Sequence, residues 1–177
     1  MKNPVSFAVL GYGHIGKRHA ATIHAHPGAE LRSVADVADV SASLESDSDG
    51  EQISVYPSID ALLAQSPLPE VISVCTPNGL HAAQCIQILE AGCHVVLEKP
   101  ISLSVFDARL VAEASASTGK HVFCVMQNRF APPSVWLKSL VESGKLGEIR
   151  QVHIQCFWNR DDSYYASSPW RGTMALD

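Results

Sequence analysis

The chain has 177 residues, of which 46% are hydrophobic and 18% charged, and its formal net charge is −5 at pH 7. This composition is typical of a folded chain that holds one domain and part of a second, and it excludes wholesale disorder. Lys and Arg do not cluster, so binding to a nucleic-acid backbone is disfavoured. No segment reaches the roughly 18 apolar residues of a membrane span, and no signal peptide is recognisable at the N-terminus. The five cysteines form no C-x-x-C pair, which predicts reduced thiols and a cytoplasmic protein.

Short β-branched runs alternate with longer helical stretches along the first 126 residues. We expect strands over residues 5–10, 30–36, 70–74, 94–97 and 121–126. We expect helices over residues 14–26, within 41–50, and over 59–65, 80–91 and 104–117. Ser58 and Ser104 stand where helix N-caps are needed, and Gly119 stands at a helix end. This alternation predicts an α/β fold with a doubly wound parallel sheet covered by helices on both faces.

The composition changes after about residue 128. A helix is expected from Ala131-Pro132-Pro133 to about residue 143, and residues 148–158 alternate polar and apolar like a strand with one exposed face. We therefore expect residues 1–127 to form one domain and residues 128–177 to begin a second, α+β domain.

A glycine-rich turn is the most specific feature of the chain. Residues 5–16 read V-S-F-A-V-L-G-Y-G-H-I-G, an apolar strand that leads into Gly11, Gly13 and Gly16. In a G-x-G-x-x-G turn the first glycine permits the tight turn, the second lets a pyrophosphate approach, and the third lets the helix pack on the strand. The helix that follows presents free N–H groups to the phosphates. The pattern predicts a Rossmann-type dinucleotide site, although a glycine-rich turn without a ligand is the alternative.

Asp36 ends the second strand, where an acidic side chain would bond the adenosine ribose hydroxyls. Residues 37–39 contain no Arg or Lys to receive a 2′-phosphate, so NAD is favoured over NADP. An ordinary surface aspartate is the alternative interpretation.

Two further strand ends carry polar residues, and ligands collect at the carboxyl ends of strands in such sheets. Thr76, Pro77 and Asn78 follow one strand, although Asn78 could equally cap the next helix. For His81 a place on the helix surface is favoured over a catalytic role. Lys99, in Glu98-Lys99-Pro100 after the next strand, could stabilise an alkoxide or carry a proton, or could form a merely structural pair with Glu98.

These motifs resemble, in order and spacing, the glucose–fructose oxidoreductase/inositol dehydrogenase/MocA family. The matching segments are G-Y-G-H-I-G, Asp36, C-T-P-N-G-L-H, A-G-C-H-V-V-L-E-K-P and Q-N-R-F. The resemblance implies a cytoplasmic NAD(P)-dependent oxidoreductase acting on a sugar CH–OH group, with Lys99 as the active-site lysine and Glu98 and Pro100 positioning lysine and cofactor. It also allows a cis Lys99–Pro100 bond. The implied cofactor contacts are Gly11, Gly13, His14, Ile15, Gly16, Asp36, Thr76, Pro77, Asn78, His81, Glu98, Lys99 and Gln127.

The tail resembles a subgroup that includes UDP-N-acetylglucosamine-uronate 3-dehydrogenases. The implied substrate contacts are Asn128, Arg129, Tyr164, Tyr165, Trp170 and Arg171. Arginines beside aromatic rings suit an anionic, ring-bearing substrate, although packing at a domain junction would use the same residues. The family's site is completed by a histidine that follows this point, so we expect a fragment of an oligomeric enzyme that binds NAD and turns over poorly or not at all.

Two other functions stay open at this stage. A relative of the same family could use NAD transiently to cleave a glycosidic bond, or could serve as a non-catalytic dinucleotide sensor. Retention of Lys99 argues against the sensor. The remaining histidines show no metal-ligand spacing, so no metal is expected, while His14 and His19 lie near enough to the glycine turn to touch phosphate or solvent.

Overall fold

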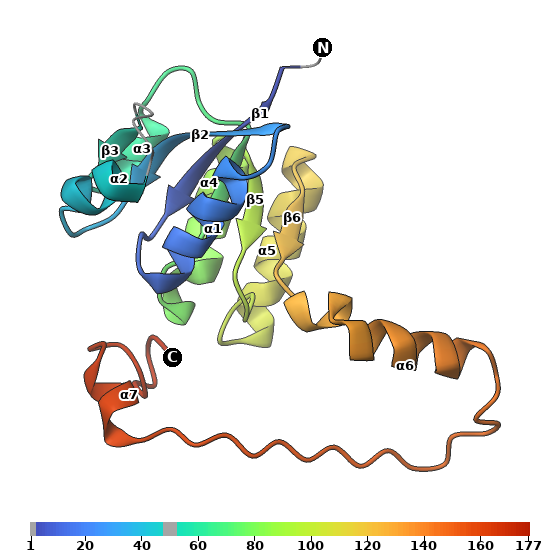
Figure 1. Cartoon of the computed structure of the whole chain (residues 1–177). Coiled ribbons are helices and arrows are strands. Elements are labelled where there is room, and N and C mark those ends of the chain that lie inside the picture. Colours follow the sequence, from blue (N-terminus) through green and yellow to red (C-terminus); the bar gives the residue numbers. More distant parts are fainter. Residues whose placement is uncertain (1–2, 48–52) are drawn as a thin grey trace. The chain divides into compact units, whose positions relative to one another are not determined.

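Six parallel strands form the sheet, in the order β3-β2-β1-β4-β5-β6 (Figure 1). The computed structural model describes residues 3–47 and 53–177. The strands are β1 Val5–Leu10, β2 Ala29–Ala35, β3 Ser54–Tyr56, β4 Val71–Val74, β5 His94–Leu97 and β6 Val122–Cys124. This order reverses between β1 and β4, which is the point where doubly wound sheets bind their ligands. The expected fold class is confirmed.

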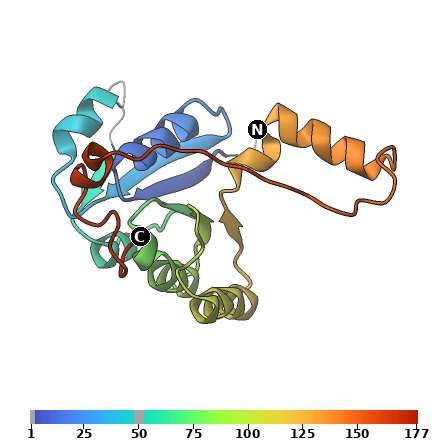
Figure 2. The same cartoon turned by 90° about the horizontal axis from the view of Figure 1, so that it is seen from below.

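Helices cover both faces of the sheet because the strands are apolar on both sides. The helices of this part are α1 His14–His24, α2 Ser41–Asp47, α3 Ile59–Leu63, α4 His81–Glu90 and α5 Val105–Thr118, with a 3-10 turn η1 Asn78–Leu80. Figure 2 shows α1 and α2 on one side of the sheet and α4 and α5 on the other. In β1, Ala8 and Leu10 belong to one buried cluster and Val9 to the other. The alternation of side chains along one strand thus supplies both cores.

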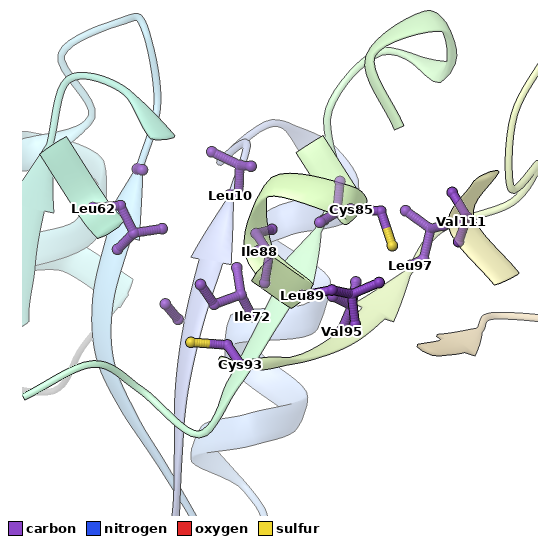
Figure 3. Close-up of a cluster of buried hydrophobic side chains, with 13 residues drawn as sticks. Leu10, Leu62, Ile72, Cys85, Ile88, Leu89, Cys93, Val95, Leu97 and Val111 are labelled. Carbon is purple, nitrogen blue, oxygen red and sulfur yellow. The ribbon is translucent and has the colours of Figure 1, made fainter. Parts of the chain in front are cut away.

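The larger core lies between the sheet and helices α3, α4 and α5. Figure 3 shows Ile88 and Leu89 of α4 beside Ile72 and Val95 of neighbouring strands, and all four side chains are fully buried. Burial of such side chains stabilises the fold by about 1.5–3 kcal/mol each. This core therefore stabilises the strands whose carboxyl ends carry the candidate site.

Both predicted serine caps are present. The Ser58 hydroxyl accepts the Ala61 N–H at 3.1 Å, and the Ser104 hydroxyl accepts the Asp107 N–H at 3.0 Å. Gly119 ends α5 with φ of 67°, a left-handed conformation that favours glycine.

The structure differs from the sequence expectations at β3 and over residues 148–158, and agrees with the helix expected within residues 41–50. Strand β3 was not expected, since three residues are too few to show a period. The helix expected within residues 41–50 spans 41–47, and residues 48–50 lie outside the described residues. Residues 148–158 form no strand, because within the part of the chain that the structure describes no neighbouring segment pairs with them.

The chain divides into two compact units, which we describe separately. The first comprises residues 1–125 and 172–177, and the second comprises residues 126–171. The second unit holds η2 Gln127–Phe130, α6 Pro132–Glu142 and α7 Asp162–Ala166, of which only α6 was expected. Its large apolar side chains are mostly exposed, including Trp136, Ile154, Phe157 and Trp158. No helix among the described residues has the length and apolar character that crossing a membrane requires.

Candidate functional site

The glycine turn joins β1 to α1, and its three glycines have three different surroundings. Gly11 has φ of 88°, and a side chain there would meet the Cys75 backbone at 2.9 Å. A Cβ at Gly16 would lie 1.9 Å from the Gly11 carbonyl oxygen, so the close approach of helix and turn requires glycine. A Cβ at Gly13 would meet nothing within 4 Å. Open space therefore lies at the N-cap of α1, where a pyrophosphate would be expected.

Side chains and backbone around this open space are free to face a ligand. His14 and Ile15 begin α1 and are both exposed. The Gly13 N-cap makes no side-chain hydrogen bond, and the first turn of α1 contains no acidic residue that would repel a phosphate.

Asp36 follows β2 and lies directly beside the glycine turn. One carboxylate oxygen accepts the Tyr12 N–H at 2.6 Å, and the other accepts the Ala38 N–H at 2.9 Å. A carboxylate has about four acceptor positions. Asp36 therefore holds the turn in place and keeps acceptor capacity for ribose hydroxyls.

The loop after β4 carries Thr76, Pro77 and Asn78. The Thr76 hydroxyl donates to Gln84, and the Asn78 amide donates to the Asp177 carboxylate at 3.1 Å. Asn78 is the first residue of η1, and Pro77 before it is the N-cap. No side-chain hydrogen bond caps this turn. The chain's last residues thus lie against this loop, where the Gly79 N–H also donates to the Leu176 carbonyl at 3.1 Å.

Lys99 follows β5 at the same carboxyl edge of the sheet, and its side chain is exposed. The peptide bond between Lys99 and Pro100 is cis, as the resemblance allowed. Glu98 beside it is paired with His19 of α1, with 3.0 Å between Nε2 and Oε1. Burial raises the pKa of Glu98, but the hydrogen bond and charge of His19 and the Lys99 amide and ammonium outweigh it, so the pKa falls below its ordinary value. Glu98 therefore remains a carboxylate.

His81 is the clearest correction to the expected site. Its side chain is fully buried rather than on the surface of α4. Nδ1 lies 2.7 Å from the Pro100 carbonyl oxygen and Nε2 lies 2.9 Å from that of Thr76. His81 therefore connects the two loops that follow β4 and β5, and its ring nitrogens face protein rather than open space.

His19 was expected near the glycine turn, touching phosphate or solvent, but its contact with Glu98 was not expected. Its position three residues after Gly16 places it about one helical turn beyond the glycine turn, on a face that reaches the end of β5. That spacing indicates the face of α1 on which His19 lies but not its partner. Gly11, Asp36, Thr76, Glu98 and Lys99 are brought to the same edge of the sheet by four neighbouring strands.

In the second unit, aromatic rings and guanidinium groups gather around Tyr164. The Arg160 guanidinium lies 4.0 Å from the centre of the Tyr164 ring, and that of Arg171 lies 4.2 Å from it. Arg171 also donates to the Tyr164 carbonyl and to the Ser167 hydroxyl, and its centre lies 5.6 Å from the Trp170 ring. Tyr165 packs edge-on against Tyr164. Arg160, which lies in the tail segment that carries the subgroup resemblance, joins the cluster from the residues before α7.

Gln127, Asn128 and Arg129 form η2 of the second unit, and all three are exposed. Among residues 3–47 and 53–177, no group of three or more His, Cys, Asp and Glu side chains could hold a metal ion. A cavity of about 450 Å³ lies between α1 and the sheet, lined mainly by apolar atoms. Its lining includes Val5, Gly28 and Ala29 at the amino ends of β1 and β2, together with His19 of α1.

Comparison with known proteins assigns the chain to a family. The model GFO_IDH_MocA, described as an oxidoreductase family with an NAD-binding Rossmann fold, matches residues 5–126. The chain belongs to this family. The resemblance drawn from the motifs is confirmed, and the glycine turn is that of an NAD-binding fold.

Several relatives are dehydrogenases. D-glucoside 3-dehydrogenase of Escherichia coli K12 is 33% identical over 148 residues, which cover 83% of this chain and 42% of the relative. Inositol 2-dehydrogenase of Rhizobium meliloti is 29% identical over 85% of this chain and 44% of its own length. The chain spans less than half the length of these relatives.

Among solved structures, the WlbA dehydrogenase from Chromobacterium violaceum was crystallised with NADH and UDP-GlcNAcA. It has a TM-score of 0.92 and 32% identity, covering all of this chain and 51% of the other. The WlbA dehydrogenase from Bordetella pertussis, crystallised with the same two ligands, is 31% identical with a TM-score of 0.92. The residues of this chain fit the dinucleotide, because Gly13 leaves a cradle that a side chain would fill and Asp36 lies beside it.

Proposed function

We propose that this chain is the cofactor-binding part, with the beginning of the substrate-binding part, of an NAD-dependent dehydrogenase that oxidises a CH–OH group of a nucleotide sugar. The observation that carries the proposal is the convergence of the glycine turn, Asp36 and Lys99 at one edge of the sheet. Residues 1–127 would bind the cofactor, and residues 128–177 would begin the second domain.

Some residues of this chain would bind the cofactor, and Lys99 would take part in the reaction. The pyrophosphate would be held by the first N–H groups of α1 and the turn formed by Gly11, Gly13 and Gly16. The Asp36 carboxylate would accept hydrogen bonds from the ribose hydroxyls. Bound NAD supplies the acceptor for the hydride that leaves the sugar carbon. The exposed Lys99 ammonium would donate to the substrate oxygen and stabilise its developing negative charge, while the hydroxyl proton would pass to water at this exposed edge. Glu98 would remain ionised beside it.

The substrate class follows from the chemistry of the second unit. Arg160 and Arg171 place two guanidinium groups against Tyr164, which suits an anionic ligand with a planar ring. A UDP-linked uronate has both features, and the WlbA dehydrogenases were crystallised with such a ligand. Asn128, Arg129, Tyr165 and Trp170 are further candidates for contacts with it.

Turnover separates this function from its two rivals. The chain is incubated with NAD and a UDP-linked uronate, and NADH is followed by absorbance while sugar products are followed by mass spectrometry. The proposal predicts that whatever NADH this chain forms is matched by an equal amount of oxidised sugar. Glycoside cleavage without net NADH would instead identify an NAD-using hydrolase.

Lys99→Met provides the matched control for this assay. We expect this variant to keep NAD affinity, measured by calorimetry, and to lose NADH formation. NADH formation by Lys99→Met equal to that of the wild-type chain, at unchanged NAD affinity, would contradict the catalytic role of Lys99.

A further inference from the structure

Two histidines, one partly buried and one fully buried, contact the loop that carries Lys99, one at each end. At the first end, His19 of α1 pairs with Glu98, and the two side chains are 16% and 15% exposed. The second oxygen of Glu98 accepts the Lys99 N–H at 3.3 Å. Glu98 therefore connects His19 of α1 with the backbone N–H of Lys99.

At the second end, the His81 ring lies between two backbone carbonyl oxygens. One belongs to Pro100, at 2.7 Å, and the other to Thr76, at 2.9 Å. The ring is fully buried, so removing it would leave polar backbone groups without a partner. His81 begins α4, which stands on the face of the sheet opposite to α1 (Figure 2).

The Lys99 side chain is exposed. The His19–Glu98 contact before it is partly buried, and the His81 contact after it is buried. Helices on opposite faces of one sheet therefore meet the same three-residue loop from two sides. We propose that His19 and His81 are a pair of positioning residues that fix Lys99 at the cofactor edge of the sheet. This role rests on the proposed function, because a fixed position of Lys99 matters only if its ammonium group contacts the substrate oxygen beside the nicotinamide.

Histidine suits both positions for a geometric reason. Its two ring nitrogens face in different directions on one rigid plane, so a single side chain approaches the carbonyl oxygens of two loops and donates to one of them from the nitrogen that carries the proton. An asparagine side chain carries both N–H groups on one nitrogen and cannot approach the two separate oxygens as the ring does. At His19, where a single carboxylate is bound, glutamine can replace the histidine.

The test compares His19→Ala, His19→Gln, His81→Ala and His81→Asn with His94→Gln. His94 is the matched control, since it lies at the opposite end of β5 and accepts the His121 N–H at 3.0 Å, far along the strand from Lys99. Each protein is examined by the ¹H–¹⁵N signal and hydrogen exchange of the Lys99 amide, by calorimetric titration with NAD, and by thermal unfolding.

We expect His19→Ala and the His81 variants to shift the Lys99 amide signal and to weaken NAD binding by about tenfold, the effect of one lost buried hydrogen bond. His19→Gln recovers most of both readouts. His94→Gln lowers the unfolding temperature but leaves the Lys99 amide and NAD affinity as they were. If His81→Ala does not fold, His19→Ala and its glutamine rescue decide the question.

The proposal is overturned if His19→Ala lowers the unfolding temperature, as the control does, while the Lys99 amide and NAD affinity stay unchanged. Failure of the wild-type chain to bind NAD would contradict the proposed function instead. In that case the Lys99 amide still reports whether the two histidines hold the loop.

Discussion

At the scale of single residues, Asp36 supports the glycine turn, and we propose that it also selects the cofactor. Its two oxygens accept N–H groups from Tyr12 and Ala38, which places the carboxylate beside the turn. A 2′-phosphate there would be repelled, while hydroxyls would be bound.

Replacing Asp36 by Asn tests this selection. The amide keeps one acceptor oxygen for the turn but loses the charge, so we expect NAD affinity to fall about tenfold, in line with the loss of a charged hydrogen bond. Affinity for NADP is expected to fall less or to rise. Calorimetric titrations with both cofactors measure the ratio, and an unchanged ratio would contradict the role given to Asp36.

The cysteines are expected to differ sharply in reactivity. Burial and the nearby Glu98 charge raise the pKa of the Cys75 thiol, and burial and Cys124 raise that of Cys85 to about 12. Cys156 is exposed. We predict that a thiol reagent at about pH 8 labels Cys156 first and leaves Cys75 and Cys85 unmodified in the folded protein, as mass spectrometry would show. Equally fast labelling of Cys75 would mean that the loop after β4 is open.

Glu98 is expected to make stability depend on pH. Its pKa in the folded chain lies below the ordinary 4.5, so its contribution is present above that value and is lost as the pH falls through the folded pKa. Glu98→Gln removes this contribution. We predict that urea unfolding shows wild type more stable than the variant near neutral pH, with the difference shrinking below pH 4.5. A difference that is constant across this range would contradict the ion pair with His19.

At the scale of elements, the sequence was most informative where a period or a cap extends over several residues. Strand β1, helix α5 and its Ser104 cap follow from such local signals. Strand β3 did not, because its three residues owe their conformation to pairing with β2. Residues 148–158 alternate like a strand, but a strand also needs a neighbour for its backbone hydrogen bonds, and the described chain provides none.

The contact between residues 172–177 and the loop after β4 gives a prediction at this scale. A Cβ at Gly79 would lie 2.0 Å from the Ala175 carbonyl oxygen, so Gly79→Ala should displace the last residues of the chain. Asn78→Ala removes only one side-chain hydrogen bond and is the milder control. We expect hydrogen exchange of the C-terminal peptide to rise strongly in Gly79→Ala and slightly in Asn78→Ala. Equal exchange in both would show that these residues do not rest on Gly79.

At the scale of the whole molecule, the parts of the site that come from consecutive residues could be predicted and the parts that come from distant ones could not. The glycine turn, Asp36 and Lys99 each lie in a local motif. The contacts of His19 with Glu98 and of His81 with Pro100 join residues 79 and 19 positions apart, and no local pattern records them. A buried ring that serves two loops is visible only once the sheet brings those loops together.

We infer that the glycine turn of this chain binds NAD, and substitution of Gly13 allows binding to be separated from folding. Gly13→Ser puts a side chain into open space and supplies a good helix N-cap, whereas Gly16→Ser forces a Cβ to 1.9 Å from the Gly11 oxygen. Gly16→Ser should therefore unfold at a lower temperature than wild type.

Calorimetric titration of wild type and Gly13→Ser with NAD is the most direct measurement. We predict saturable binding at one site in the wild-type chain and at least about tenfold weaker binding in Gly13→Ser, with its unfolding temperature preserved. Undiminished NAD binding by a fully folded Gly13→Ser chain, or no binding by wild type, would contradict the claim.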